Sequence, residues 1–193
     1  VLDEVNNLML LGSNSALGDD VYSNNGAVDL WLLSVGTDGV LSSNSSTGGL
    51  LNDYPKDLYF NESTFRAIIV SETFSDWLPP EETEPVTSNI LVAELIPFGG
   101  EQWKLILGGG GFDNPTSIIG TIDGGFLISG HSFSNDGNLT GNKGGADFWL
   151  VKLGYPCPDE LKLDAATFTK SVSRTAENFI STNSKFEGTH SHV

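Results

Sequence analysis

The sequence predicts an all-β fold built from repeated units, and two sets of apolar strings support this. The first set consists of short runs typical of strands, "LMLLGSN", "AIIVSET" and "FLISGHS", which begin at Leu8, Ala67 and Phe126 and so are equally spaced along the chain. The second set, "VDLWLLSVG", "SNILVAELI" and "ADFWLVKLG", places Trp31, Leu91 and Trp149 at nearly the same spacing. Because both sets share one period and favour pleated, half-buried surfaces, we interpret the period as a structural repeat of β-strands.

The first and third copies of the repeat align without a gap, so that Gly12 matches Gly130 and Gly36 matches Gly154. Both copies contain the motif Asp-x-Trp-Leu at the same place, starting at Asp29 and at Asp147. Chance would rarely produce such a match in the same register. We therefore expect the tryptophans of the two motifs to occupy equivalent positions and to pack in the core between neighbouring units.

Each unit is predicted to contain about four antiparallel strands. In the third unit, the strand "PTSIIGTI" ends at an Asp123-Gly124-Gly125 turn, and "GFLISGHS", a long polar loop and "DFWLVKLG" follow. Asp-Gly pairs between apolar runs are typical of hairpins. A fourth strand is visible in the second unit, at "EQWKLILGGGG". Units of about four strands in series are typical of β-propeller blades.

The three units are expected at about residues 1–53, 54–114 and 115–154, which together form one propeller-like repeat domain. By the alignment of the copies, the first unit lacks most of its opening strand, and the third lacks a recognisable fourth strand. Three blades do not close a ring, so an incomplete ring is predicted. After Gly154 the composition shifts to few glycines and many Ser, Thr and Lys residues. This shift predicts a small, partial β domain over residues 155–193.

The charge and cysteine content exclude several classes of protein. The chain has 25 acidic and 9 basic residues, a formal charge of −16, and such a surface repels phosphate backbones. We therefore expect no nucleic-acid partner. No window approaches the roughly 18 consecutive apolar residues of a membrane helix, so no transmembrane helix is predicted. The single cysteine, Cys157, cannot form a disulfide within the chain, and its pairing with another chain is open.

The polar loop of the third unit has the spacing of a calcium-binding loop. Oxygen-bearing side chains fall at positions 1, 3, 5 and 7, glycine at position 6 and a carboxylate at position 12. The candidate ligands are Asp136, Asn138, Thr140, Asn142 and Asp147. The alternative is a turn that Asn and Asp side chains stabilise without a metal. No other cofactor is indicated.

A tryptophan in the second unit is the candidate contact residue. Trp77 lies in "FSDWLPPEE", where neighbouring prolines oppose burial, although packing under its own loop is an equal alternative. No nucleophile elbow, phosphate loop or Cys-x-x-Cys pair is present in the sequence. We therefore do not expect an enzyme.

The stretch "TSIIGTIDGGFLISGHSFSNDGNLTGNKGGADFWLVKLG" resembles a repeat found in secreted and cell-surface proteins of Bacteroidota. That repeat has a Thr-x-Asp-Gly-Gly turn, a glycine-rich polar loop and an Asp-x-Trp-x-Val-Lys-Leu strand. The matching residues here are Thr121, Asp123, Gly124, Gly125, Ser134, Asn135, Asp136, Gly137, Gly141, Asn142, Gly144, Asp147, Trp149, Val151, Lys152 and Leu153. The chain departs from the repeat at Asn138, where Asp is usual, and the second unit lacks the polar loop.

The tail resembles the opening of a short strand-rich domain common near the ends of such proteins. The matching residues are Cys157, Pro158, Ala176, Asn178, Ile180 and Asn183. Together the two resemblances imply export through the type IX secretion pathway to the surface or medium of a Gram-negative bacterium. Neither resemblance implies an enzymatic activity.

We therefore expect a non-catalytic extracellular or cell-surface module for adhesion, protein–protein contact or structural spacing. Its partners would be other surface or outer-membrane proteins, or glycans. The alternative is a glycan-binding or glycan-degrading propeller, which would recruit carboxylates from the loops. The candidates for that role are Asp19, Asp20, Asp136 and Asp147.

Overall fold

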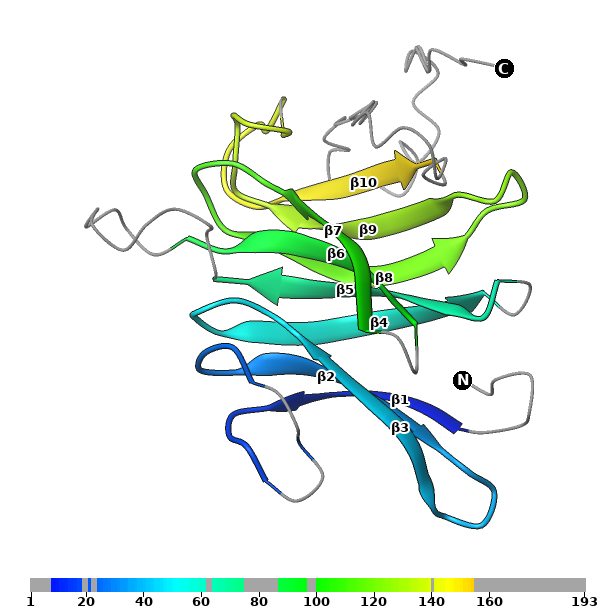
Figure 1. The fold of residues 1–193 in the computed structure, drawn as a ribbon. Coiled ribbons are helices and arrows are strands. Elements are labelled where there is room, and N and C mark those ends of the chain that lie inside the picture. The colour runs from blue at the N-terminus through cyan, green and yellow to red at the C-terminus, as the bar shows by residue number, and fades with distance from the viewer. Residues whose placement is uncertain are drawn as a thin grey trace.

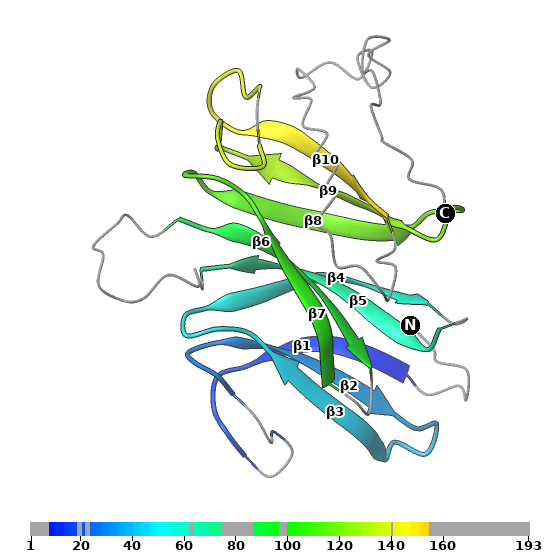
Figure 2. The ribbon, with the colours of Figure 1, turned by 45° about the horizontal axis from the view of Figure 1, so that its top comes forward.

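A computed structural model describes residues 8–18, 21, 24–61, 64–74, 87–96, 100–139 and 141–154. These residues form ten β-strands and no helix, which confirms the predicted all-β class. The strands belong to three antiparallel sheets that lie one above another (Figure 1; Figure 2). The predicted tail domain, together with Trp77, Thr140 and Cys157, lies outside the described residues.

Each sheet is a meander in which consecutive strands are neighbours. The first sheet has the order β1 (Leu8–Asn14), β2 (Asp29–Val35), β3 (Leu41–Thr47). The second has the order β4 (Asp53–Asn61), β5 (Arg66–Thr73), β6 (Asn89–Ile96), β7 (Gly100–Leu107). The third contains β8 (Asp113–Gly120), β9 (Phe126–Ser132) and β10 (Asp147–Leu153), with β9 in the middle.

The sequence repeat is a repeat of strand pairs in the same register. Trp31 of β2 lies opposite Gly12 of β1, and Trp149 of β10 lies opposite Gly130 of β9. The strands β4 and β8 begin at Asp53 and Asp113, just before the predicted starts of the second and third units. These two strands are equivalent edge strands in their sheets.

Both edge strands carry a proline next to a break in register. In β4 the register shifts between Pro55 and Asp57, and in β8 it shifts between Pro115 and Ser117. Proline cannot donate to a strand ladder, so edge strands and bulges are the positions that tolerate it. The matched bulges show that the repeat extends to the irregular features of the backbone.

Two hydrophobic cores lie between the sheets, one on each face of the second sheet. The first core joins the first and second sheets and contains Met9, Leu30, Leu32, Phe60, Ala67, Ile69, Leu91, Ala93 and Leu95. The second joins the second and third sheets and contains Ile68, Val70, Ile90, Val92, Leu107, Ile118, Phe126, Ile128, Leu139, Trp149, Val151 and Leu153. Because β5 and β6 are covered on both faces, their sequences are continuous apolar runs.

The two repeated tryptophans differ in burial. Trp149 is 3% exposed and packs in the core between the second and third sheets, as predicted. Trp31 is only partly buried, because it points from the first sheet away from the second, toward a side that no described sheet covers. The expectation that Trp31 packs between two units is therefore not met within the described residues. The described sheets stack in series and do not close a ring.

Candidate functional site: the loop end of the stack

The long connections of all three units leave from one end of the stack, which we call the loop end. Antiparallel meanders place the connections from the second to the third strand of each unit on the same side. The connections that carry the chain between sheets, residues 48–52 and 108–112, lie at this end as well (Figure 1). The short turns at residues 36–40 and 121–125 lie at the opposite end.

A buried aspartate anchors the loop end between the second and third sheets. Asp113 is 0% exposed, and its Oδ2 accepts hydrogen bonds from the Gly109 N–H at 2.9 Å and the Ser134 hydroxyl at 2.8 Å. Its Oδ1 accepts a further hydrogen bond from the Ser132 hydroxyl. The backbone N–H of Asp113 donates to Ser88 O at 2.8 Å. One carboxylate thus joins the intersheet connection to the start of the β9–β10 loop.

The same anchor occurs one unit earlier. Asp53 is 0% exposed and accepts a hydrogen bond from the Gly49 N–H at 2.8 Å, while its own N–H donates to Val28 O at 2.7 Å. Both connections share the pattern Gly-Gly-x-x-x-Asp, from Gly48 to Asp53 and from Gly108 to Asp113. The pattern was not recognised from the sequence, although its recurrence with the period of the repeat could have revealed it.

The first half of the β9–β10 loop lies on the glycine-rich connection. The Gly110 N–H donates to Asp136 Oδ1 at 2.7 Å, and the Gly111 N–H donates to Ser134 Oγ at 2.9 Å. The Asn138 N–H donates to Gly108 O at 3.0 Å. A side chain at Gly109 would place its Cβ 2.6 Å from the backbone oxygen of Asp136, so only glycine permits this approach.

The second half of the loop forms a compact turn around an asparagine. Asn142 donates to Ser132 O and Gly145 O, each at 3.1 Å, and accepts from the Gly144 N–H at 2.7 Å. Gly144 has φ of 112°, a conformation that other residues rarely adopt. The Asp147 carboxylate closes the turn by accepting from the Lys143 N–H.

The first unit contains the same turn, built from equivalent residues. Asn24 accepts from the Gly26 N–H at 3.2 Å and donates to Asn14 Oδ1 at 2.8 Å. Asp29 Oδ2 accepts from the Asn25 N–H, as Asp147 does from Lys143. The matched Asn, Gly and Asp positions of the two loops therefore have a structural role at the loop base.

The predicted calcium ligands form part of this backbone scaffold. Asp136, Asn138, Asn142 and Asp147 each use an oxygen to accept a backbone N–H, as the turn alternative predicted. Among the described residues, no group of three or more His, Cys, Asp or Glu side chains lies close enough to hold a metal. Thr140 is outside the described residues, so calcium binding stays a prediction. Asp19 and Asp20, the other candidate carboxylates, also lie outside them.

A pair of carboxylates in the first unit was not expected from the sequence. Asp29 is 0% exposed, and its Oδ1 has no hydrogen-bond partner. Burial raises the pKa of Asp29, the Asn25 N–H opposes this increase, and the negative charge of Asp53 adds to it. A Cβ at Gly48 would overlap Asp29 Oδ1, so glycine is required where the carboxylates of Asp29 and Asp53 meet.

The Asp123-Gly124-Gly125 turn at the opposite end forms where the sequence predicted it. Asp123 caps it by accepting hydrogen bonds from the Thr121 hydroxyl and the Gly125 N–H. Lys152 lies 2.8 Å from the same carboxylate. The hydrogen bond from Lys152 is the main cause of the lowered pKa of Asp123, and those from Thr121 and Gly125 add to it.

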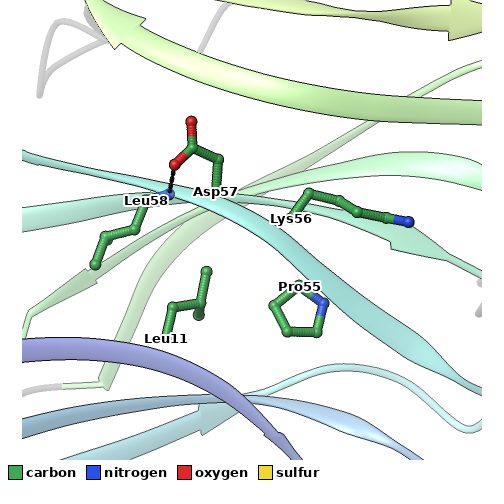
Figure 3. A pocket seen from close by; sticks show the side chains of 5 residues that line it. All are labelled: Leu11, Pro55, Lys56, Asp57 and Leu58. Atoms are coloured by element: carbon green, nitrogen blue, oxygen red, sulfur yellow. Dashed lines mark hydrogen bonds between the residues drawn. The ribbon is translucent and has the colours of Figure 1, made fainter.

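A shallow hollow between β1 and β4 is lined by residues with structural partners. Figure 3 shows Leu11, Pro55, Lys56, Asp57 and Leu58 around it. Asp57 Oδ2 accepts from the Ser117 hydroxyl at 2.7 Å and from the Ile118 N–H at 2.9 Å, and so connects β4 to β8. Lys56 pairs with Glu72 at 2.9 Å. The charged groups of the hollow therefore hold strands together.

No protein-family model and no curated protein sequence matches the chain. Within the part of the chain that the structure describes, no helix has the length and apolar character needed to span a bilayer.

Proposed function

We propose that this chain is a non-catalytic module exposed on the surface of a Gram-negative bacterium, or released by it, which contacts other surface proteins through its loop end. The resemblance to a Bacteroidota repeat supports this location and export by the type IX pathway. An acidic surface with a formal charge of −16 is compatible with an extracellular module and unsuited to nucleic acid.

The arrangement of constant framework and variable loops supports a role in contact. The framework repeats the buried anchors Asp53 and Asp113 and the register of the strands. The loops that the framework presents differ in sequence: "SNSALGDDVYSNNGAV", "FSDWLPPEETEPVTSN" and "FSNDGNLTGNKGGA". Loops that vary on a rigid scaffold are the usual location of binding residues.

The first loop base and the third loop are fixed by internal hydrogen bonds. In the third loop, Asp136, Asn138, Asn142 and Asp147 all bond to the backbone. A loop ordered in this way loses little conformational entropy when it binds. This favours specific contact by the loop end over a role as a passive spacer.

Site-specific photocrosslinking tests the proposal. A photoreactive residue is placed at the exposed Lys143, at the loop end, and at the exposed Ile122, at the opposite end, as the matched control. The probe is a preparation of outer-membrane vesicles from a Bacteroidota species. We expect discrete protein adducts from position 143 and few from position 122.

Two results would contradict the proposal. Equal labelling from both positions, or none from either, would remove the basis for a contact role of the loop end. A parallel screen against purified polysaccharides addresses the alternative function. Defined sugar binding or sugar turnover by the chain would replace protein contact with glycan recognition.

A further inference from the structure

The repeat gives each sheet a face that packs on the preceding sheet. In the second sheet this face consists of Ala67, Ile69, Leu91, Ala93 and Leu95, all of which lie in the first core. In the third sheet the equivalent residues are Phe126, Ile128, Trp149, Val151 and Leu153, all of which lie in the second core. The same five positions are therefore buried at both intersheet interfaces.

The residues at the equivalent positions of the first sheet, a face that we call the head face, belong to neither of the two cores. It consists of Leu8, Leu10, Trp31, Leu33 and Val35, which the pairing of β1 with β2 places on one side of the sheet. Leu8 and Leu10 are 43% and 40% exposed, and the other three are half-buried. The head face therefore carries apolar residues at the positions of a core face, but none of them is fully buried.

The indole nitrogens show that the head face is built like its buried counterparts. The Nε1 atoms of Trp31 and Trp149 are both buried within the protein and have no hydrogen-bond partner. The two indoles also lie opposite equivalent glycines, Gly12 and Gly130. The head face thus presents Trp31 in the arrangement that Trp149 uses at the third sheet.

The opposite face of each sheet packs on the sheet that follows. In the second sheet this face includes Ile68, Val70, Ile90 and Val92, all in the second core. The equivalent positions of the third sheet form the face that we call the tail face. They are Leu127, Ser129, Phe148 and Leu150, all half-buried, and they lie beside Ile119, which is 55% exposed. One molecule therefore has both complementary halves of an intersheet interface, at its two ends.

We infer that the head face is a docking surface for the tail face of a second copy of this chain. The interface would repeat the two intersheet interfaces that already exist within the molecule, with the same repeat positions in contact. The contact is head-to-tail, so the two copies contribute different surfaces to it. This inference goes beyond the proposed function, which uses the loop end and not the faces of the sheets.

Sedimentation of the full chain from micromolar to near-millimolar concentration tests the inference. We expect the wild-type chain to associate as concentration rises. Leu10→Lys on the head face and Ile119→Lys on the tail face should each weaken this association by roughly 10- to 100-fold, because a lysine would be buried without a partner. Ile122→Lys, in an exposed turn away from both faces, should leave association unchanged. Circular dichroism checks that each variant is folded.

A mixture of the two face variants provides the decisive test. Leu10→Lys retains an intact tail face and Ile119→Lys retains an intact head face, so the equimolar mixture should form heterodimers and nothing larger. A head-to-head dimer would instead be abolished by Leu10→Lys alone and unaffected by Ile119→Lys. A wild-type chain that stays monomeric throughout, or a mixture that does not associate, would overturn the inference.

Discussion

Replacing Asp113 by alanine should be among the most damaging single changes at the loop end. The carboxylate is 0% exposed and accepts hydrogen bonds from the Gly109 N–H and from the hydroxyls of Ser132 and Ser134. The two serines are 5% and 3% exposed, so water cannot readily replace the lost acceptor. The substitution leaves two buried hydroxyl donors and the partly buried Gly109 N–H without this acceptor.

The cost follows from the number of donors that lose their acceptor. An unsatisfied buried donor costs roughly 1–3 kcal/mol, and hydrogen bonds to a charged acceptor are at the upper end of this range. Removal of a buried charge recovers part of the loss, because the folded chain no longer desolvates a carboxylate. We expect Asp113→Ala to lower the free energy of unfolding by about 3–5 kcal/mol.

Urea unfolding followed by tryptophan fluorescence and by circular dichroism measures this change. Asp136→Ala is the matched control, because the exposed Asp136 accepts one hydrogen bond from Gly110 and should cost about 1 kcal/mol or less. A loss below about 1 kcal/mol for Asp113→Ala would refute the assignment of this residue as an anchor. Coincident transitions from both probes would show that the loss applies to the whole stack.

Three further predictions follow from packing and charge. Burial raises the pKa of Asp29, so the wild-type protein loses stability as this carboxyl ionises with rising pH. Asp29→Asn should therefore be more stable than the wild type at pH values above the ordinary carboxyl pKa of 3.8, and thermal melts of the two proteins should agree at more acidic pH. Gly109→Ala should cost about 1–3 kcal/mol in urea unfolding, whereas Gly18→Ala, whose Cβ meets no atom within 4 Å, should be nearly neutral. At concentrations where the chain is monomeric, Trp149→Ala should cost about 3–5 kcal/mol and Trp31→Ala distinctly less, and equal losses would contradict the different burial of the two indoles.

The strands that the sequence predicted best are those whose apolar residues form a core. The repeat period located β1, β5 and β9, because each contains a run of apolar residues in which at least one face must be buried. The strand β3 has the sequence "LSSNSST" and was not predicted as a strand. It forms because pairing with β2 satisfies its backbone groups, a tertiary effect that intrinsic propensity does not reveal.

The sequence identified the residues of the loop bases without revealing what they contact. The spacing of Asp136, Asn142 and Asp147 is compatible with a calcium loop and equally with a turn, since both need oxygen atoms and glycines at similar intervals. The distinction depends on which backbone N–H groups lie nearby. Those of Gly110 and Lys143 are brought there by the intersheet connection and by the turn itself.

The first residue of β2, β6 and β10, which are the equivalent strands of the three units, shows how the repeat separates stability from function. It is Asp29 in the first unit, Asn89 in the second and Asp147 in the third. The amide of Asn89 occupies the place of a carboxylate beside Gly108, as Asp29 does beside Gly48. A neutral amide can therefore occupy this position, so it does not need a negative charge, and a buried charge there is a cost. Because the framework requires only a few such polar side chains and glycines, the loop residues between them are free to differ from unit to unit, and the differences accumulate at the end of the stack where we propose that contact occurs.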